Sequence, residues 1–181
     1  MAQATASANE LWRSRSRPAG QLRLTLRRPH RFAAAVSTLR IEQPDDDAGF
    51  KDWRYVHNLI IPTHQLSLDD VRERAGRNTL EVAYRDDVLV GCTTVRPPAD
   101  DDAMATVIAR VLPGHRGQGL GRRLYERGLK RARELGAGAI ETVVLTSNTD
   151  GLRFAGKHGF VEVERYVLPG ESIPWCTLRL A

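Results

Sequence analysis

One glycine-rich stretch carries the residue pattern best suited to chemistry, and it runs from Val111 to Arg122 with the sequence VLPGHRGQGLGR. A β-rich run precedes it and leucines at helical spacing follow it, which predicts a strand, a tight turn and a helix. Glycines let the backbone approach a ligand closely, and the free amides at a helix N-terminus bind anions. We therefore expect a phosphate-type anion to bind at this turn.

Two common phosphate-binding motifs do not fit this turn. A Walker loop reads G-x-x-x-x-G-K-S/T, and no lysine stands at the required place. The dinucleotide motif G-x-G-x-x-G needs its third glycine where this chain has Arg122. A different motif must therefore hold the anion.

The turn reads R-x-x-G-x-G from Arg116 to Gly121, V-x-P precedes it, and Asn148 and a K-x-G-F segment at Lys157–Phe160 follow it. With these motifs at these distances, the chain resembles the Gcn5-related N-acetyltransferase (GNAT) superfamily over residues 37–181. The resemblance implies an acyl-CoA-dependent N-acyltransferase. It also implies an α/β fold with a central, mostly antiparallel mixed sheet, one splayed parallel strand pair, and helices on both faces.

The resemblance also assigns residues to the co-substrate, acetyl-CoA or another acyl-CoA, and it implies no metal. The backbone amides from Arg116 to Gly121 would surround the pyrophosphate, and Arg122 would contact a phosphate. The strand backbone at Ala109 and Val111 would bind the pantetheine arm where this strand splays from its neighbour, and a main-chain amide would act as oxyanion donor. Asn148 would bind the pantetheine end or the pyrophosphate side. The predicted set is Ala109, Val111, Arg116, Gly117, Gln118, Gly119, Leu120, Gly121, Arg122 and Asn148.

The motifs do not identify the acid or the base of the reaction. The family usually places a tyrosine seven residues after the asparagine, to protonate the leaving sulfur, and this chain has Ala155 there. Tyr166 is the candidate acid, with a packed strand aromatic as the alternative. His64 lies in the loop Pro62–Leu66, which in the family forms part of the acceptor wall. We expect it to act as base or substrate contact, with a solvated loop histidine as the alternative.

The elements that must position these residues follow from hydrophobic periodicity and turn residues. The expected strands span Thr38–Gln43, Thr79–Arg85, Val88–Val95, Ala105–Leu112, Ile140–Leu145, Phe160–Leu168 and Ile173–Leu180. The expected helices run from the Pro44–Asp47 cluster to Ile61, from Ser67 to Gly76, from Leu120 to Gly136, and from Thr149 to His158. Ser67 and Asp70 have nearly the spacing of a capping box, and Asp86-Asp87 predicts a tight hairpin turn. This order is typical of one mixed α/β domain.

Charge is distributed unevenly along the chain of 181 residues, whose net charge is +5. Residues 1–31 contain seven arginines and one acid, so they carry the whole positive excess. We expect residues 1–36 to form a basic, disordered extension and residues 37–181 to form the acetyltransferase-like domain. A transit peptide and a nucleic-acid-binding arm are the alternatives for the extension, although it has only two aromatic residues, Trp12 and Phe32, and lacks the repeated pattern that such arms use. The basicity of the chain therefore says nothing about the ligand of the domain.

Cysteine usage and hydropathy indicate a cytoplasmic protein. Cys92 and Cys176 each lie in an apolar run, as reduced buried thiols do, and no apolar run is long enough to cross a membrane. The expected partner is an amine of a small molecule or of a protein, rather than a membrane or a nucleic acid, and the resemblance adds a homodimer through the last strands as an option. The alternative function is a regulatory module that binds acyl-CoA without catalysis, because Ala155 replaces the usual tyrosine.

Overall fold

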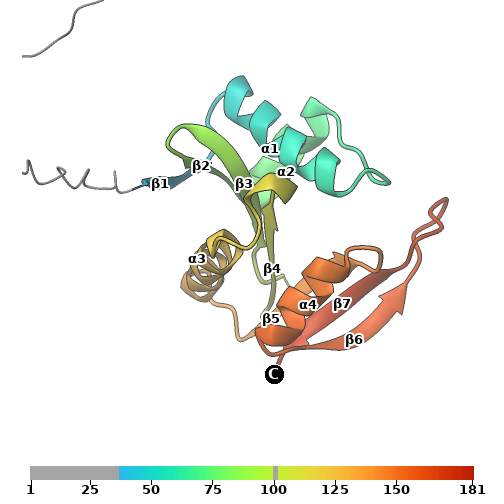
Figure 1. The fold of residues 1–181 in the computed structure, drawn as a ribbon. Coiled ribbons are helices and arrows are strands. Elements are labelled where there is room, and N and C mark those ends of the chain that lie inside the picture. The colour runs from blue at the N-terminus through green and yellow to red at the C-terminus, as the bar shows by residue number, and fades with distance from the viewer. Residues whose placement is uncertain (1–36, 100–101) are drawn as a thin grey trace, which may run out of the picture. The chain divides into compact units, whose positions relative to one another are not determined.

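The computed structural model describes residues 37–99 and 102–181, and the predicted basic extension lies outside them. Its sheet has seven strands in the order β1-β2-β3-β4-β5-β7-β6 (Figure 1). The strands are β1 (Leu39–Glu42), β2 (Thr79–Arg85), β3 (Val88–Arg96), β4 (Met104–Val111), β5 (Ala139–Leu145), β6 (Phe160–Tyr166) and β7 (Trp175–Leu180). The helices are α1 (Asp47–Ile60), α2 (Leu68–Arg77), α3 (Leu120–Glu134) and α4 (Thr149–Lys157), with a 3-10 turn at Pro113–His115. The element order is the predicted one, and the α/β fold class is confirmed.

Helices cover both faces of the sheet. On one face α3 approaches β4 so closely that a Cβ on Gly128 would lie 2.6 Å from Val107 Cγ1. On the other face α1 buries Trp53 against Cys92 of β3. The Trp53 indole also donates a hydrogen bond from Nε1 to Thr93 O at 2.9 Å. The sheet is therefore the middle layer of the domain, with apolar side chains packed on each side.

The parallel strands β4 and β5 are paired at one end only. Their ladder joins Met104–Thr106 to Ala139–Glu141. Beyond it β4 continues on β3, whereas β5 continues on β7, and the two strands diverge (Figure 1). Every other strand pair in the described residues is antiparallel. The predicted splayed pair is therefore confirmed, and from Val107 to Val111 the edge of β4 that faces β5 has no partner strand in the described residues.

Most element boundaries differ from the predicted ones by one or two residues, and two of these differences have a clear local reason. The prediction that Gly76 ends α2 is wrong, because Gly76 keeps a helical backbone and the helix runs on to Arg77. Asn78 then forms the cap, and both its backbone N–H and its side-chain amide donate to the last turn. β7 begins at Trp175, two residues later than predicted. Pro174, which precedes it, has no N–H to donate to a ladder.

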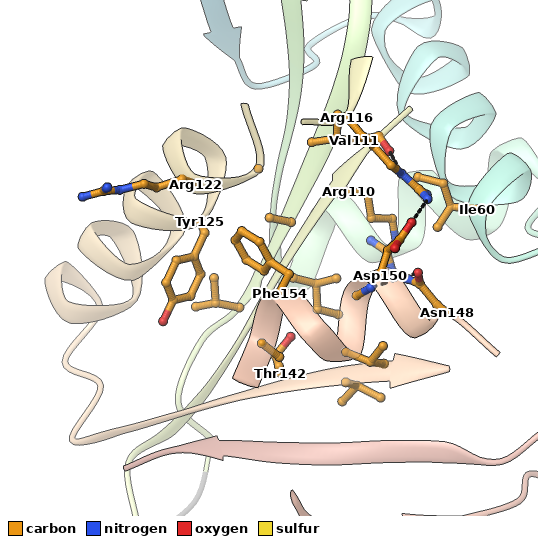
Figure 2. A pocket seen from close by; sticks show the side chains of 18 of the residues that line it. Ile60, Arg110, Val111, Arg116, Arg122, Tyr125, Thr142, Asn148, Asp150 and Phe154 are labelled. Atoms are coloured by element: carbon orange, nitrogen blue, oxygen red, sulfur yellow. Dashed lines mark hydrogen bonds and ion pairs between the residues drawn. The ribbon is translucent and has the colours of Figure 1, made fainter. Parts of the chain in front are cut away.

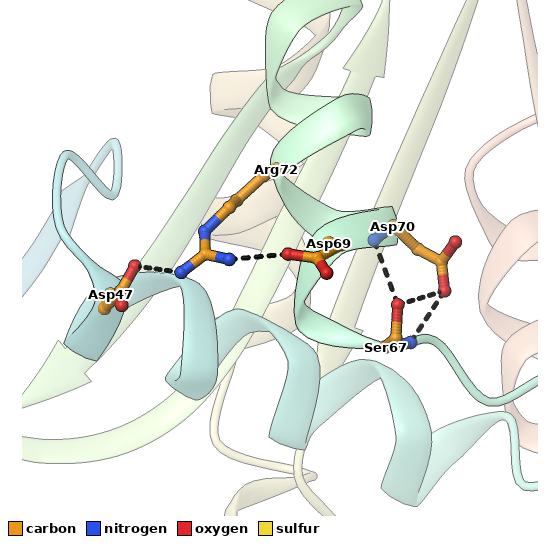
Figure 3. A network of polar contacts seen from close by, with 5 residues as sticks. All are labelled: Asp47, Ser67, Asp69, Asp70 and Arg72. Carbon is orange, nitrogen blue, oxygen red and sulfur yellow. Dashed lines mark hydrogen bonds and ion pairs between the residues drawn. The ribbon is translucent and has the colours of Figure 1, made fainter.

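Polar contacts lie at the N-termini of α1 and α2 (Figure 3). Ser67 and Asp70 form the predicted capping box: Asp70 N donates to Ser67 Oγ at 3.1 Å, and Ser67 N donates to Asp70 Oδ2 at 2.8 Å. Arg72 bridges Asp69 of α2 and Asp47 of α1, at 2.6 Å from each carboxylate. Because these ion pairs are exposed, they add little stability, and the packing of Val56 against Val71 in the shared apolar cluster holds α2 on α1. Two hydrogen bonds between Asn58 and the backbone of Leu66 hold the loop that joins the helices.

His57 of α1 is a buried histidine, with 3% of its surface exposed. It stacks on Trp53 with ring centroids 5.3 Å apart, and its Nε2 lies 3.1 Å from His64 O. Burial lowers its pKa from 6.5 to about 3, and the positive charge of Arg110 acts in the same direction. The folded protein therefore keeps this imidazole neutral at pH values where the unfolded chain would protonate it.

Acidification should destabilise the protein through His57. Between pH 6.5 and about pH 3 only the unfolded chain binds this proton, so the free energy of unfolding falls by about 1.4 kcal/mol for each unit that the pH falls. From pH 6.5 to pH 5 the expected loss is about 2 kcal/mol, measured by urea unfolding. His57→Gln keeps an amide donor for His64 O and should remove this part of the pH dependence. Equal pH slopes in both proteins would contradict the assignment.

Candidate active site

A cavity of about 550 Å³ lies where β4 and β5 diverge (Figure 2). Its walls come from both strands, from the glycine-rich turn and first turns of α3, from α4, and from the end of α1. The turn contributes Gly117 and Gly119, whereas Ile60 and Ile61 line the cavity from α1. The cavity therefore connects the helix N-terminus on one side of the sheet to α1 on the other.

The backbone of β4 faces this cavity at alternate residues. Leu112 N donates to Val90 O on β3 at 2.9 Å. Because successive residues of an antiparallel strand turn their N–H and C=O groups to opposite sides, Ala109 and Val111 turn theirs away from β3. The ladder to β5 has already ended at Thr106, so these groups have no partner strand in the part of the chain that the structure describes. They can hydrogen-bond an extended ligand much as a sheet edge binds an added strand.

The N-terminus of α3 offers an open anion site. Gly119 is the N-cap residue, with a left-handed backbone (φ 77°, ψ −2°), and no described side chain caps the helix there. Gly117 is also left-handed, at φ 73°, and a Cβ on either glycine would meet no atom within 4 Å. The first N–H groups of the helix therefore lack a capping side chain, and the positive end of the helix dipole attracts an anion to them.

Arg116 links two walls of the cavity. Its Nε donates to Val111 O at 3.2 Å, and its Nη1 lies 3.3 Å from Asp150 Oδ2 on α4 (Figure 2). Arg122 instead extends away from these groups and pairs with Glu126 at 2.7 Å (Figure 2). The positive charge beside the glycine turn therefore comes mainly from Arg116, with Asp150 as its counter-ion.

Eight of the ten predicted cofactor residues line the cavity, and they come from β4, the turn, α3 and α4. The other two contribute no side chain to it. Leu120 is buried in the core, and Gln118 accepts a hydrogen bond from Arg85 of β2. Asn148 is the N-cap of α4, where its Oδ1 accepts from Gly151 N at 3.1 Å. Its side chain thus caps a helix and forms part of the cavity wall.

A splayed strand edge beside an uncapped helix N-terminus matches a known family. Residues 36–160, more than half of the chain, match the acetyltransferase (GNAT) family. The chain belongs to this family. The predicted family and the predicted class of enzyme, N-acetyltransferase, are confirmed. No curated protein sequence matches the chain.

Solved structures of acetyltransferases share the fold at low sequence identity. yncA from Salmonella typhimurium, solved with its cofactor acetyl-CoA, is 19% identical with a TM-score of 0.63, over 78% of this chain and 92% of its own. The ribosomal-protein-S18-alanine N-acetyltransferase from Escherichia coli is 17% identical with a TM-score of 0.63, over 79% and 93%. Naa50 from Arabidopsis thaliana, in complex with the bisubstrate analogue CoA-Ac-MVNAL, is 18% identical with a TM-score of 0.62, over 79% and 98%.

This GNAT protein has two tyrosines near the cavity and an alanine at the family's usual acid position. Ala155 is buried in the cavity wall. Tyr166, the predicted acid, does not line the cavity but packs in the cluster of Ile61 and Leu145, which do. Tyr125 lines the cavity from α3, and its buried hydroxyl has no hydrogen-bond partner among the described residues. Burial raises the pKa of Tyr125, so this hydroxyl stays protonated.

His64, the predicted base or substrate contact, belongs to a network that no sequence motif marks. Its Nδ1 lies 3.2 Å from Glu171 Oε1, and Trp175 Nε1 donates to Glu171 Oε2 at 2.7 Å. Glu171 lies in the loop between β6 and β7, with only 10% of its side chain exposed. His64 N also donates to the backbone oxygen of Ile61, which lines the cavity. The network therefore joins the α1–α2 loop to the β6–β7 loop beside the cavity.

The sequence pattern singled out neither Arg110 nor Glu171 as a site residue. Arg110 does have a detectable signal, because it is a single charge inside an otherwise apolar strand. Glu171 has no such sequence signal, since its contact with His64 joins positions 107 residues apart.

Within residues 37–99 and 102–181, no group of three or more His, Cys, Asp or Glu side chains is placed to hold a metal ion.

Proposed function

We propose that the protein transfers an acyl group, most simply acetyl, from acyl-CoA to an amine of a small molecule or a protein. The observation that carries this proposal is the meeting of a free strand edge and an uncapped helix N-terminus in one cavity. The backbone of Ala109 and Val111 suits the amides of pantetheine, and the turn at Gly117 and Gly119 suits the pyrophosphate. Both features belong to the backbone, so they do not depend on any single side chain.

Transfer proceeds by direct attack within a ternary complex. The neutral amine nitrogen adds to the thioester carbonyl carbon, its proton passes to a base, and the C–S bond breaks to release the thiolate. A thiol has a pKa of about 8.5, so its anion is a tolerable leaving group near neutral pH, and Ala155 does not prevent the reaction. His64 is the proposed base, because Glu171 holds its ring beside the cavity wall. Alignment of both substrates in one cavity supplies much of the rate.

Tyr166→Phe should lower kcat by about 10-fold, with KM for both substrates unchanged. The effect is modest because the hydroxyl would only assist a leaving group that departs readily without it. Steady-state release of free thiol measures it. Tyr125→Phe is the matched control, since it removes the other tyrosine hydroxyl near the cavity. A fall in kcat in Tyr125→Phe alone would transfer the acid role to α3.

The proposed function is tested by turnover. The protein is mixed with acetyl-CoA and a broad panel of amines, free thiol is followed with a chromogenic reagent, and CoA affinity is measured by calorimetry. Acceptor-dependent thiol release would support an enzyme. Tight CoA binding without release across the panel would instead support the regulatory module that Ala155 suggests.

Cellular location and assembly are further parts of the proposal. Cys92 and Cys176 are free and buried, as expected in the cytoplasm, and burial raises the pKa of Cys92 to about 11. None of the described helices has the length and apolar composition needed to cross a membrane.

β6 is an edge of the sheet and exposes Val161 and Val163, so the predicted homodimer would pair through this strand.

A further inference from the structure

Arg110 places a positive charge in the part of the cavity that adjoins α1. Its neighbours Ala109 and Val111 pack toward α3, so the side chain of Arg110 projects to the opposite face of the sheet. There its guanidinium lies 5.9 Å from the ring centroid of Trp53, and Nη1 lies 3.4 Å from Thr94 Oγ1. Figure 2 shows it on the same side of the cavity as Ile60 and away from Arg122 and Tyr125.

Among the described residues, this guanidinium has no acidic partner within ion-pair distance. Within residues 37–99 and 102–181, no ion pair includes Arg110. Its neighbours are the Cys92 thiol, which hydrogen-bonds it, and two cations, Arg96 and Arg74, which both interact with it unfavourably. Burial lowers the pKa of Arg110, the contact with Cys92 opposes this shift, and the charge of Arg96 adds to it. The cavity therefore holds an excess positive charge beside α1.

An anion would compensate this charge, because even a half-buried guanidinium is stabilised when an acceptor pairs with it. Arginine binds carboxylates and similar oxyanions through two parallel hydrogen bonds. The phosphates of CoA are proposed to bind at the turn of Gly117 and Gly119, at the α3 end of the cavity. The second substrate is then the remaining source of an anion near Arg110.

We infer that the amine acceptor carries a carboxylate or a similar oxyanion, and that Arg110 binds this group. The inference rests on the proposed function and names the class of its acceptor. Free amino acids and peptides that begin with an acidic residue both present this chemistry. The charge of Arg110 would then select the acceptor and would orient its amine toward the thioester.

The test compares acceptors that differ only in charge. Free amino acids, their carboxamides, and peptides beginning with Asp or with Asn are assayed by thiol release with acetyl-CoA. The wild-type protein should favour the carboxylate member of a matched pair by about 30-fold in kcat/KM. Arg110→Gln should remove this preference and leave the rate with neutral acceptors, and the affinity for CoA, within about 3-fold of wild type. Arg133→Gln, which removes an exposed arginine outside the cavity, should change neither.

A second measurement does not depend on the variant folding. In the wild-type protein, 2-hydroxy acids should compete with the acceptor, because they keep the carboxylate and lack the amine, whereas 2-hydroxy amides should not compete. If acidic peptides are acetylated and free amino acids are not, the inference is supported, and the acceptor's oxyanion then belongs to a polypeptide. Equal use of carboxylates and carboxamides, or loss of CoA affinity in Arg110→Gln, would overturn it. Tight CoA binding without thiol release for any acceptor would overturn the proposed function itself.

Discussion

Gly119→Glu is expected to weaken CoA binding by about 1000-fold. Gly119 is the N-cap of α3, and a side chain there would point into open space beside the free amides of the helix. A carboxylate in that space would stand where the pyrophosphate is proposed to bind. Two like charges about 4 Å apart, at an effective dielectric constant of about 20, repel each other by about 4 kcal/mol, which corresponds to this loss. Isothermal titration with CoA measures the affinity.

Two variants separate the charge from the backbone effect. Gly136 is also left-handed, at φ 88°, and a Cβ there would also meet nothing within 4 Å, but it lies beyond the other end of α3. Gly136→Glu adds the same charge and a similar backbone strain, and it should leave CoA affinity unchanged. Gly119→Ala adds strain without charge and should cost about 1 kcal/mol of stability with little loss of affinity. If Gly119→Glu bound CoA as the wild type does, the phosphate would not lie at this turn.

The fold was predictable where local chemistry determines it. Asp86 and Asp87 adopt φ values of 49° and 63°, as the residues of a tight hairpin turn must. Ser67 starts α2 because its hydroxyl and the carboxylate of Asp70 satisfy free backbone amides. The end of α2 was not predictable from Gly76 alone, since a glycine in the last turn can remain helical when the next polar residue supplies the cap. Boundaries thus depend on competition between neighbouring caps, whereas the elements themselves depend on periodicity.

The two halves of the candidate site differ in how much the sequence reveals. The turn of Gly117 and Gly119 is visible because anion binding there uses the backbone, and glycine is the residue that its left-handed conformation favours. The acceptor side uses side chains from distant segments: His64 meets Glu171 only because the α1–α2 loop and the β6–β7 loop are brought together in the fold. Such contacts depend on how strands and helices pack, and no local pattern encodes them. That no described carboxylate forms an ion pair with Arg110 is likewise a tertiary property.

His64→Ala should lower kcat by about 1000-fold and leave the affinity for acetyl-CoA unchanged, because His64 is proposed to remove the amine proton and is not one of the proposed cofactor-binding residues. The structure supports a base here through orientation. Glu171 holds Nδ1 at 3.2 Å, and among the described residues the opposite nitrogen, Nε2, makes no hydrogen bond. A histidine held by a carboxylate through one nitrogen presents the other to a reacting proton. Single-turnover thiol release, with acceptor in excess, measures the chemical step.

Two further experiments distinguish a catalytic base at His64 from a histidine with only a structural role: rescue of His64→Ala by imidazole, and substitution of Glu171, which orients the ring. Added imidazole should restore part of the rate in His64→Ala, since the small base can occupy the vacated space, whereas a protein that had only lost packing would not respond. Glu171→Gln keeps a hydrogen-bond acceptor for Trp175 but loses the charge that orients His64, so kcat should fall by about 10-fold with KM unchanged. Glu164→Gln, at an exposed position on β6, is the matched control and should behave as wild type. Full activity in His64→Ala would show that water or another group takes the proton, and Glu171 would then only tie the β6–β7 loop to the α1–α2 loop.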